Sequence, residues 1–376
     1  MKFSINSKVL LSRLVASGKA INSRPTISIL GCFLFSLKGN ILSITASDAD
    51  STVVSRIEVA DAEADGMVCI DAKRITELLK SMPDCPVSFT VNPNMEVLLR
   101  HPKGKYNLSG FQGSDYPIND AVNPDDIKGE FTIPTSQILS AFDKVGFAIA
   151  SDDLRPQLNG IFWDIKPDSI TYVATDTHVL AKYRNTQIAP GVETSFILPG
   201  RSIPLIRAFI NKQAEIKVTT TGKKVVIEGA DFKVSSTLLN GNYPNYNRVI
   251  PQNQPVIIIV DRNDFYDAIT RVSICASTQE PTLRFKLSTD HIDAIAEDIC
   301  YNVGGEESIA CEYSGADMNI GFGSSYLKGL VNALETQKMV IKLSTPGRPG
   351  VFVPSENDEH GELTLLCMPV NISSAN

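Results

Sequence analysis

A strand followed by a helix, repeated six times at nearly constant spacing, limits the possible folds of this sequence more than any other feature. The pattern is clearest in GEFTIPTSQILSAFDKV, residues 129–145, where Phe131 and Ile133 alternate with polar residues as in a half-buried strand. Thr135 is expected to cap the helix that follows. Similar segments begin at residues 3, 67, 131, 196, 257 and 318, which are 64, 64, 65, 61 and 61 residues apart. A spacing this regular predicts a repeat architecture.

Each repeat is predicted to contain a strand, a helix and three further strands. In the first repeat the last three strands are expected at residues 32–37, 41–46 and 52–59, and in the second at 87–92, 95–101 and 105–108. Helices combined with antiparallel strands imply a two-layer α+β fold with the helices on one side. The six helices are expected at residues 7–21, 71–82, 135–148, 199–213, 261–274 and 323–338.

Polar segments that contain proline follow the second and fourth repeats. They are YPINDAVNPDD, residues 116–126, and YPNYNRVIPQNQP, residues 243–255. Segments of this composition often separate domains. We therefore expect three domains of two repeats each, at residues 1–125, 126–251 and 252–376.

The predicted helices are basic although the chain as a whole is acidic. They contain 14 Lys and Arg but 7 Asp and Glu, so they carry a net charge of +7, whereas the whole chain carries −7. Basic residues gathered on one repeated element would attract a polyanion there and repel it elsewhere. Lys and Arg are also good helix formers on solvated faces, so charge alone leaves both explanations open.

Composition excludes membrane, secreted and metal-binding classes. The sequence has no run of eighteen apolar residues, and its apolar N-terminal segment is too short for a secretion signal, so a cytoplasmic protein is expected. The seven cysteines show no CxxC spacing and mostly lie in apolar runs. They are expected to be reduced, with no zinc site, and neither a metal nor a cofactor is predicted.

Six motifs, in order along the chain, resemble the bacterial β sliding clamps, the processivity subunits of the replicative DNA polymerase. They are SRPTISILG (residues 23–31), LNGIFW (158–163), VATDTHVLA (173–181), NGNYPNYNRVIP (240–251), IGFGSSYLKGLVNAL (320–334) and LLCMPV (365–370). The resemblance implies three similar clamp domains per chain, with helices on an inner face and antiparallel sheets outside. It also implies a head-to-tail dimeric ring, in which pairing of exposed sheet edges removes an aggregation hazard.

In this family the joint between subunits lies between the first domain of one and the third domain of the other. The matching apolar positions are Tyr106 and Leu108, on a strand that we expect to be a short edge strand, and Ile274 and Cys275. Ordinary core packing is the alternative for these four residues.

A ring that slides along any sequence needs attraction to phosphate without base readout, which Lys and Arg supply. The resemblance places Arg24 and Arg201 at inner-surface contacts, and the helix charge adds Lys73, Arg74, Lys80, Arg207 and Lys212. An exposed cation without a partner is the alternative for each.

Where many relatives carry residues that touch DNA, this chain has Asp152, Asp153, Pro156 and Gln157. The two carboxylates are expected to repel phosphate there.

The resemblance also implies a peptide-binding cleft between the second and third domains. A mostly apolar groove with adaptable Met side chains suits an extended motif from many partners. Core packing is the alternative for its apolar members. The matching positions are Leu158, Thr175, Thr177, His178, Leu180, Pro244, Arg248, Val249, Leu366, Met368, Pro369, Val370 and Ile372.

The chain departs from the family pattern around this cleft. Thr177 and Val179 flank His178 where Gly and Arg are common, Asn371 replaces a usual Arg, and residues 373–376 extend past the usual end. We expect the groove to persist with a changed preference. For His178, a hydrogen bond to a loop is the alternative to ligand contact.

Enzyme classes have little support. The chain has four histidines and lacks GxSxG, GxxxxGK[ST], HExxH and a GxGxxG after a strand. Asp48 and Asp50 could suggest a metal-dependent nuclease, but Asp48 aligns with Asp176 as the same turn of a repeat, which favours a structural role. The competing hypotheses are a carbohydrate- or nucleotide-processing enzyme and a purely structural self-associating protein.

The sequence therefore predicts a non-catalytic sliding clamp that encircles duplex DNA and tethers the replicative polymerase. Its other expected partners are a second copy of itself, other replication and repair proteins, and a separate clamp loader, because no nucleotide-hydrolysing loop is present. No membrane partner is expected.

Overall fold

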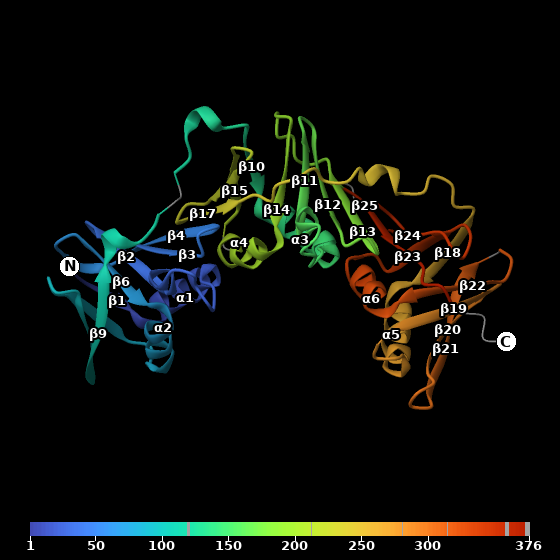
Figure 1. The fold of residues 1–376 in the computed structure, drawn as a ribbon, viewed down its shortest axis with the longest axis horizontal. Helices are drawn as coiled ribbons and strands as arrows, with labels where there is room; N and C mark the ends of the chain where they lie inside the picture. Colours follow the sequence, from blue (N-terminus) through green and yellow to red (C-terminus); the bar gives the residue numbers. More distant parts are fainter. Residues whose placement is uncertain (119–120, 212, 280, 314, 358–360, 373–376) are drawn as a thin grey trace. The chain divides into compact units, whose positions relative to one another are not determined.

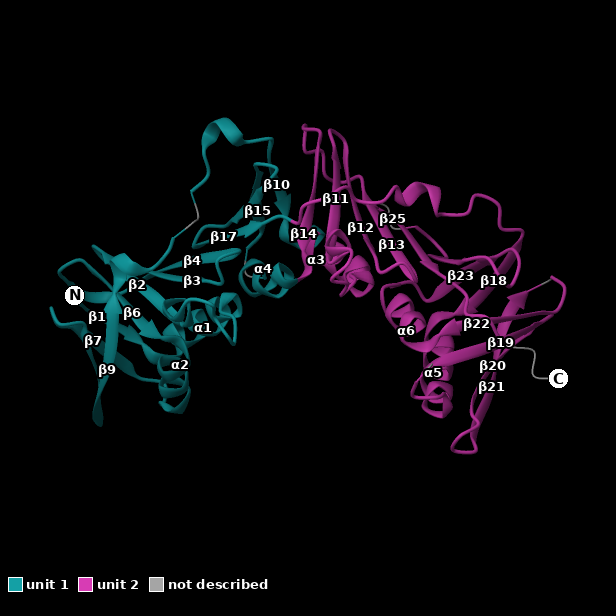
Figure 2. Cartoon of the chain, viewed as in Figure 1, with its two compact units in different colours: residues 1–137, 201–238 teal, residues 138–200, 239–376 magenta. Residues whose placement is uncertain are grey.

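The computed structural model describes residues 1–118, 121–211, 213–279, 281–313, 315–357 and 361–372. Contacts divide the chain into two compact units (Figure 2). Unit 1 contains residues 1–137 and 201–238, and unit 2 contains residues 138–200 and 239–376. The predicted membership in an α+β class agrees with helices and antiparallel strands in both units.

Each unit contains one long sheet. In unit 1 the strand order is β10 (Gly129–Pro134), β15 (Glu215–Thr220), β16 (Lys224–Glu228), β17 (Phe232–Thr237), β4 (Ser51–Glu58), β3 (Ile41–Ser47), β2 (Cys32–Lys38), β6 (Gly66–Asp71), β9 (Gly104–Gln112), β8 (Glu96–His101), β7 (Pro86–Val91), β1 (Lys2–Asn6) and β5 (Ala60–Glu63). In unit 2 the order is β14 (Thr194–Pro199), β11 (Gly160–Lys166), β12 (Ser169–Thr175), β13 (Val179–Asn185), β25 (Gly361–Cys367), β24 (Gly350–Pro354), β23 (Lys338–Leu343), β18 (Val256–Asp261), β21 (Val303–Tyr313), β20 (His291–Asp298), β19 (Thr282–Ser288) and β22 (Met318–Gly323).

The helices of each unit lie together on one side of its sheet. In unit 1, α1 contacts both α2 and α4, and in unit 2, α5 contacts α6 (Figure 1). The bounds are α1 (Ser7–Ser17), α2 (Ala72–Ser81), α3 (Thr135–Val145), α4 (Ile203–Ile210), α5 (Arg262–Val272) and α6 (Ser324–Asn332). Short 3-10 turns continue or precede several of them, namely η1 (Gly18–Ala20), η5 (Gly146–Ala148), η7 (Gly200–Ser202) and η9 (Ser273–Cys275).

The predicted repeat is confirmed by the element order. A strand, a helix and three strands follow one another six times, from β1-α1-β2-β3-β4 to β22-α6-β23-β24-β25. Each helix buries one face, as α2 does with Ile75 and Leu79, and acidic or amide side chains at Asn6, Asp71 and Asp261 cap first-turn N–H groups.

The repeats interlock in pairs because their first strands are exchanged. β1 pairs with β7 and β6 pairs with β2, so each first strand lies beside the second strand of the other repeat. The same exchange joins β10 to β15 and β14 to β11, and β18 to β23 and β22 to β19. Buried residues face each other across these pairs, such as Phe3 opposite Phe89 and Ile258 opposite Ile341. Each such side chain stabilises the pair by about 1.5–3 kcal/mol.

The sheets continue from one pair of repeats to the next. β17 pairs with β4 in unit 1, and β13 pairs with β25 in unit 2. Both pairs join strands from different predicted domains, which explains why each contact-based unit takes one half of residues 126–251. The three domain boundaries therefore stay a prediction.

The turns predicted at Asp48 and Asp176 are equivalent. Asp48 Oδ1 accepts the N–H groups of Asp50 and Ser51 at 3.0 and 2.6 Å, and Asp176 Oδ1 accepts those of His178 and Val179 at 2.8 Å each. Ala49 and Thr177, the residues next to these aspartates, both have positive φ, of 80° and 81°. These carboxylates fold a turn, which confirms the structural interpretation of the acidic cluster.

Several predicted boundaries are wrong. The last helix ends at Asn332 rather than 338, because Lys338 opens β23 and pairs with Asp261 on β18. Tertiary pairing overrides helix propensity there. Strand β5 was not predicted, since its sequence ADAE shows no apolar alternation and it adds to β1 through the backbone.

Two further expectations need correction. Thr135 is the first residue of α3 and its hydroxyl is buried without a hydrogen-bond partner within the described residues, so its side chain does not cap the helix. Strand β9 is longer than expected, and its last residues, Gly110 to Gln112, pair with β6. It is an edge strand only over residues 104–109, which pair with β8 alone among the described strands.

Candidate functional site

Unit 2 contains a groove of about 930 Å³. Its walls come from the ends of β12, β13 and β25, the segment 243–253, and the loop 344–349. The lining residues are Leu158, Thr175, Thr177, Val179, Leu180, Tyr243, Pro244, Asn245, Tyr246, Arg248, Val249, Pro251, Gln252, Asn253, Ser344, Gly347, Arg348, Pro349, Leu366 and Met368. The volume is that of a typical ligand site.

An aromatic and aliphatic cluster forms the base of the groove. Leu180 and Leu366 pack with Val173 and Tyr246, and Phe162 stacks on Tyr243 with ring centroids 4.7 Å apart. Tyr246 donates its hydroxyl proton to Asp164 Oδ2 at 2.8 Å, and burial raises the pKa of Tyr246. The base is therefore preformed, and an apolar ligand group can enter it without reorganising it.

The predicted cleft residues fall into two groups. Nine of them line the groove: Leu158, Thr175, Thr177, Leu180, Pro244, Arg248, Val249, Leu366 and Met368. The other four lie beside it. His178 stacks on Tyr326 of α6 with ring centroids 5.5 Å apart, and its carbonyl accepts the N–H of Met368 at 2.7 Å. Val370 donates its N–H to Gly321 at 2.8 Å, and Pro369 and Ile372 flank this contact with β22. The roles of all thirteen stay a prediction.

Sequence reasoning missed a second cation of the groove, Arg348. Arg348 comes from the loop STPGRP, whose prolines and glycine indicate a turn but give no reason to place it beside Arg248. Both guanidinium groups are exposed, and no Asp or Glu is among the lining residues. The groove therefore combines apolar surface with two positive charges in a protein whose net charge is −7.

Four of the predicted DNA contacts are exposed cations in unit 1. Lys73, Arg74 and Lys80 project from the polar side of α2, and Arg24 lies in the segment that precedes β2. Among the described residues none of the four has an ion-pair partner, so their charge is available to a phosphate. Lys212 lies outside the described residues.

Arg201 and Arg207 are less available to a phosphate than the sequence suggests. Arg201 forms an ion pair of 2.7 Å with Asp50, in which both side chains are about half exposed. Arg207 is half-buried. A phosphate would compete with Asp50 for Arg201. An exposed ion pair of this kind contributes at most about 1 kcal/mol to the stability of the protein.

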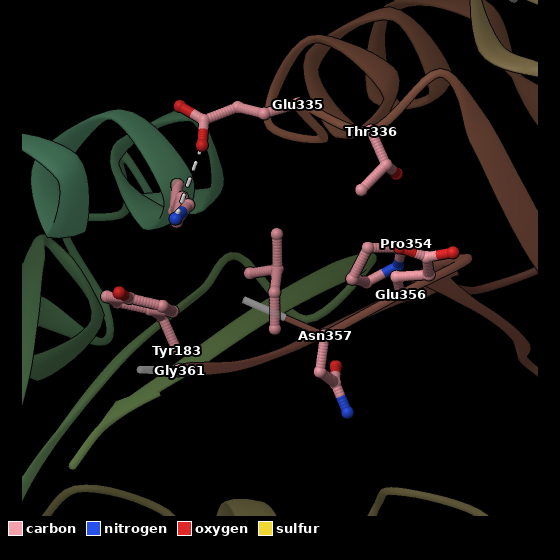
Figure 3. A pocket seen from close by; sticks show the side chains of 9 residues that line it. Tyr183, Glu335, Thr336, Pro354, Glu356, Asn357 and Gly361 are labelled. Atoms are coloured by element: carbon pink, nitrogen blue, oxygen red, sulfur yellow. Dashed lines mark ion pairs between the residues drawn. The ribbon is translucent and has the colours of Figure 1, made fainter. Parts of the chain in front are cut away.

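Lys144, one of the basic helix residues, faces a separate cavity of about 310 Å³ in unit 2 (Figure 3). Only 6% of its side chain is exposed, its Nζ lies 3.4 Å from Glu335 Oε2, and it sits 4.5 Å from the centre of the Tyr183 ring. The ammonium group of Lys144 thus interacts with Glu335 and Tyr183 within the protein. It adds nothing to a DNA-facing surface, which the charge count from sequence could not reveal.

The repulsive patch expected near residue 152 is also smaller than predicted. Asp152 accepts the N–H of Leu154 at 2.8 Å and forms an ion pair of 2.8 Å with Arg155. Its hydrogen bond from Leu154 and its contact with Arg155 lower the pKa of Asp152. Arg155 balances this carboxylate, so only Asp153 presents an exposed, uncompensated charge in this turn.

The four predicted dimer contacts lie on strand β9 and in the turn η9. Tyr106 is 39% exposed and Leu108 is half-buried, both on the part of β9 for which β8 is the only partner among the described strands. Ile274 is 79% exposed and precedes Cys275 in η9. Exposure of this kind argues against core packing for Tyr106 and Ile274.

Comparison with known families covers nearly the whole chain. Residues 1–120, 132–245 and 247–370 match, in order, the N-terminal, central and C-terminal domains of the DNA polymerase III beta subunit. The chain belongs to the DNA polymerase III beta subunit family. This confirms the resemblance inferred from the motifs.

Named beta sliding clamps are similar to this chain over nearly their full length. The beta sliding clamp of Bacillus subtilis strain 168 is 27% identical, over 98% of this chain and 99% of that protein. The beta sliding clamp of Pseudomonas aeruginosa PAO1 is 26% identical, over 97% and 99%. A crystal structure of the DNA polymerase sliding clamp from B. subtilis aligns with a TM-score of 0.92 at 25% identity, covering 99% of this chain and 100% of that one. The three-domain clamp fold is therefore confirmed.

Membership in the beta subunit family also supports the expectation of a non-catalytic protein. In the described ranges no group of three or more His, Cys, Asp or Glu side chains could hold a metal ion. None of the helices in those ranges is long and apolar enough to cross a membrane.

The seven cysteines are free thiols, and burial raises the pKa of Cys32 to about 11 and that of Cys367 to about 12.

Thr177 gives a first testable prediction for this beta subunit. A β-branched residue at a φ of 81° is strained, by roughly 1–2 kcal/mol, whereas glycine adopts this conformation freely. We expect Thr177→Gly to stabilise the protein by about 0.5–1 kcal/mol after the greater flexibility of unfolded glycine is subtracted. Urea unfolding would measure this change. Thr132→Gly, on strand β10, should instead destabilise the protein, and a loss of stability in both variants would contradict the assigned strain.

Proposed function

We propose that two copies of this chain close a ring around duplex DNA, and that the ring tethers the replicative DNA polymerase. The observation that carries this proposal is the match of all three beta subunit domains, in order, to one chain that spans the length of named beta sliding clamps. Neither the alternative of a nucleotide-processing enzyme nor that of a purely structural protein explains this match together with the groove.

Attraction to DNA would come from the basic helices of unit 1. Lys73, Arg74 and Lys80 lie on one helix and have no ion-pair partners in the described structure, and Arg24 and Arg201 are exposed as well. Such cations bind phosphate without reading bases, as sliding requires. Arg207 and Lys212 are proposed to contribute from the same region of the sequence.

Partners would bind through the groove of unit 2. Its apolar base suits two or three anchoring side chains of an extended peptide, each contributing about 1.5–3 kcal/mol on burial. Arg248 and Arg348 favour a peptide that also carries a carboxylate. We propose that the polymerase catalytic subunit and other replication and repair proteins use this groove in turn.

Opening of the ring would need a separate protein. The sequence has no GxxxxGK[ST] loop for nucleotide hydrolysis, so we propose that a clamp loader opens the ring in the cytoplasm, at the nucleoid.

The test is whether retention on DNA is topological. We expect the protein, loaded on nicked circular DNA by the clamp loader of the same organism, to remain with the circle through gel filtration. Cutting the circle once with a restriction enzyme should release it, because a threaded ring slides off a free end. Equal retention on circular and linear DNA would contradict the proposal, since it would indicate tight chemical binding.

The same assay tests the basic helix. Lys73→Glu combined with Arg74→Glu should lower loading on circular DNA, and the slope of log affinity against log salt should fall by about 0.9 for each phosphate that the variant no longer binds. The matched control is Lys286→Glu with Lys342→Glu, which changes the net charge equally on strands β19 and β23. Equal losses in both variants would mean that α2 is not the DNA-facing surface.

A further inference from the structure

The tripeptide Leu-Asn-Gly occurs twice in unit 2. The first copy, residues 158–160, leads into β11, and the second, residues 239–241, lies just before the groove segment 243–253. Asparagine followed by glycine is especially prone to lose its side-chain amide, because glycine has no Cβ to hinder attack by its backbone nitrogen. The two copies have the same local sequence, so the structure around each decides whether it reacts.

The first copy is held in place. Asn159 Oδ1 accepts the N–H of Asp152 at 2.9 Å, and Asn159 Nδ2 donates to the carbonyl of Asp152 at 3.0 Å. Gly160 is buried and lies opposite Pro199 in the pairing of β11 with β14, with no room for a Cβ beside the carbonyl of Leu198. The amide carbon and the nitrogen that would attack it are therefore both fixed.

The second copy is open. Asn240, Gly241 and Asn242 are exposed and lie outside every helix and strand. Within the described residues, neither the side chain of Asn240 nor the N–H of Gly241 has a hydrogen-bond partner. A Cβ added to Gly241 would meet Gln157 first, at 3.4 Å, which is ordinary van der Waals contact. The side chain of Asn240 can therefore turn toward the next peptide nitrogen.

We propose that Asn240 is a site of spontaneous deamidation, and that its products weaken peptide binding in the groove as the protein ages. The backbone nitrogen of Gly241 attacks Cγ of Asn240 and closes a five-membered succinimide. The side-chain nitrogen leaves as ammonia and takes the proton of the Gly241 N–H. Water then opens the ring. Attack of water at Cγ gives aspartate, and attack at the backbone carbonyl carbon gives isoaspartate, in which the main chain runs through the former side chain.

The reacting segment connects two fixed points. On one side, the N–H of Leu239 donates to the carbonyl of Ile197 at 3.1 Å. On the other, Tyr243 stacks on Phe162 and donates its hydroxyl proton to the carbonyl of Val173 at 3.4 Å. Isoaspartate adds one carbon atom to the main chain between these points, or about 1.5 Å of backbone. The added length must be absorbed by residues 240–242 or by a shift of Tyr243.

Both effects act on the groove. Tyr243 belongs to its apolar base, and a displaced base packs less well on the anchoring side chains of a peptide. Each product also adds a negative charge next to the groove, which opposes the positive charge of Arg248 and Arg348. We expect the isoaspartate form to bind a peptide that carries a carboxylate roughly threefold more weakly, or worse. This consequence rests on the proposed function of the groove, whereas the deamidation itself does not.

The two tripeptides provide an internal control for the reaction. The full-length protein would be kept at mildly alkaline pH, and mass spectrometry of its tryptic peptides would follow the replacement of NH₂ by OH. We expect Asn240 to react roughly tenfold faster than Asn159, or more, because two hydrogen bonds of Asn159 must break first. In concentrated urea the two rates should become similar. Methylation by an isoaspartyl methyltransferase would identify the isoaspartate. Equal rates in the folded protein, or no product at Asn240, would overturn the proposal.

Peptide binding tests the consequence. Fluorescence polarisation with a labelled peptide from the polymerase catalytic subunit would compare fresh protein with aged protein of known isoaspartate content. The control is Asn240→Gln, which would have to close a six-membered ring and therefore reacts far more slowly. After the same ageing it should keep the affinity of fresh protein.

The variant Met368→Glu, in the lining of the groove, separates the two ways of failing. If aged protein with isoaspartate at position 240 binds as tightly as fresh protein while Met368→Glu binds weakly, the effect on the groove is overturned and the proposed function stands. If Met368→Glu also binds as tightly as the unaltered protein, the groove is not the partner site, and the proposed consequence of deamidation fails with it.

Discussion

The variant Ile274→Asp is expected to be a monomer of 40.9 kDa that does not stay on circular DNA. Ile274 is 79% exposed in the single chain, so the substitution should cost the folded protomer little. In a joint between copies the carboxylate would be buried without a partner, which costs several kcal/mol. Sedimentation would report the mass, and gel filtration on nicked circles would report retention.

Ile257→Asp is the matched control for this experiment. Ile257 is 52% exposed on strand β18, where it lies opposite Lys342 of β23. The Ile257→Asp variant should leave both the dimer and its retention on circular DNA unchanged. If Ile274→Asp kept the mass of a dimer, the η9 contact would not be part of the joint, and the choice of Tyr106, Leu108 and Cys275 as its neighbours would also be in error.

Peptide binding should weaken strongly when Met368 becomes Glu. Met368 lines the groove and is 39% exposed, so it can accept a carboxylate without unfolding the protein. An anchoring side chain that no longer packs on Met368 loses about 1.5–3 kcal/mol, which corresponds to a loss of affinity of roughly ten- to a hundredfold. Fluorescence polarisation with a labelled peptide from the polymerase catalytic subunit would measure it.

Two controls define the result for the groove. Ile257→Glu adds the same charge to an exposed apolar side chain in the same unit and should not change the affinity. Arg348→Ala should weaken binding of a peptide with a carboxylate more than that of its amide analogue, because the carboxylate then has one cation fewer to meet. Unchanged affinity in Met368→Glu, with the dimer intact, would remove the groove as the partner site.

The parts of the fold that depend on short-range patterns could be predicted from the sequence. Alternating residues such as Phe131 and Ile133 marked the strands, and the Asp48 and Asp176 turns followed from local hydrogen bonding by aspartate. The exchange of first strands between paired repeats could not be predicted. A first strand such as β1 presents the same alternation to its own repeat and to the other, and only the packed sheet decides between them.

The site was predictable to a similar degree. Motifs placed Leu180, Leu366 and Met368 together at the groove, since they belong to segments that resemble the clamp family. Arg348 was missed because its loop is brought to the groove by the pairing of β25, the neighbour of β24, with the distant strand β13, which no local signal reports. The burial of Lys144 against Tyr183 and the pairing of Arg201 with Asp50 were missed for the same reason, because each depends on residues distant in sequence.

The exchange of first strands restricts how a protein of this kind can change its length. A repeat added or deleted singly would leave one opening strand without an acceptor and one acceptor without a strand, and both would expose apolar faces such as those of Phe3 and Phe89. Gene duplications and truncations should therefore be tolerated only in even steps. The smallest autonomous fragment of this chain would be two consecutive repeats, beginning with an odd one.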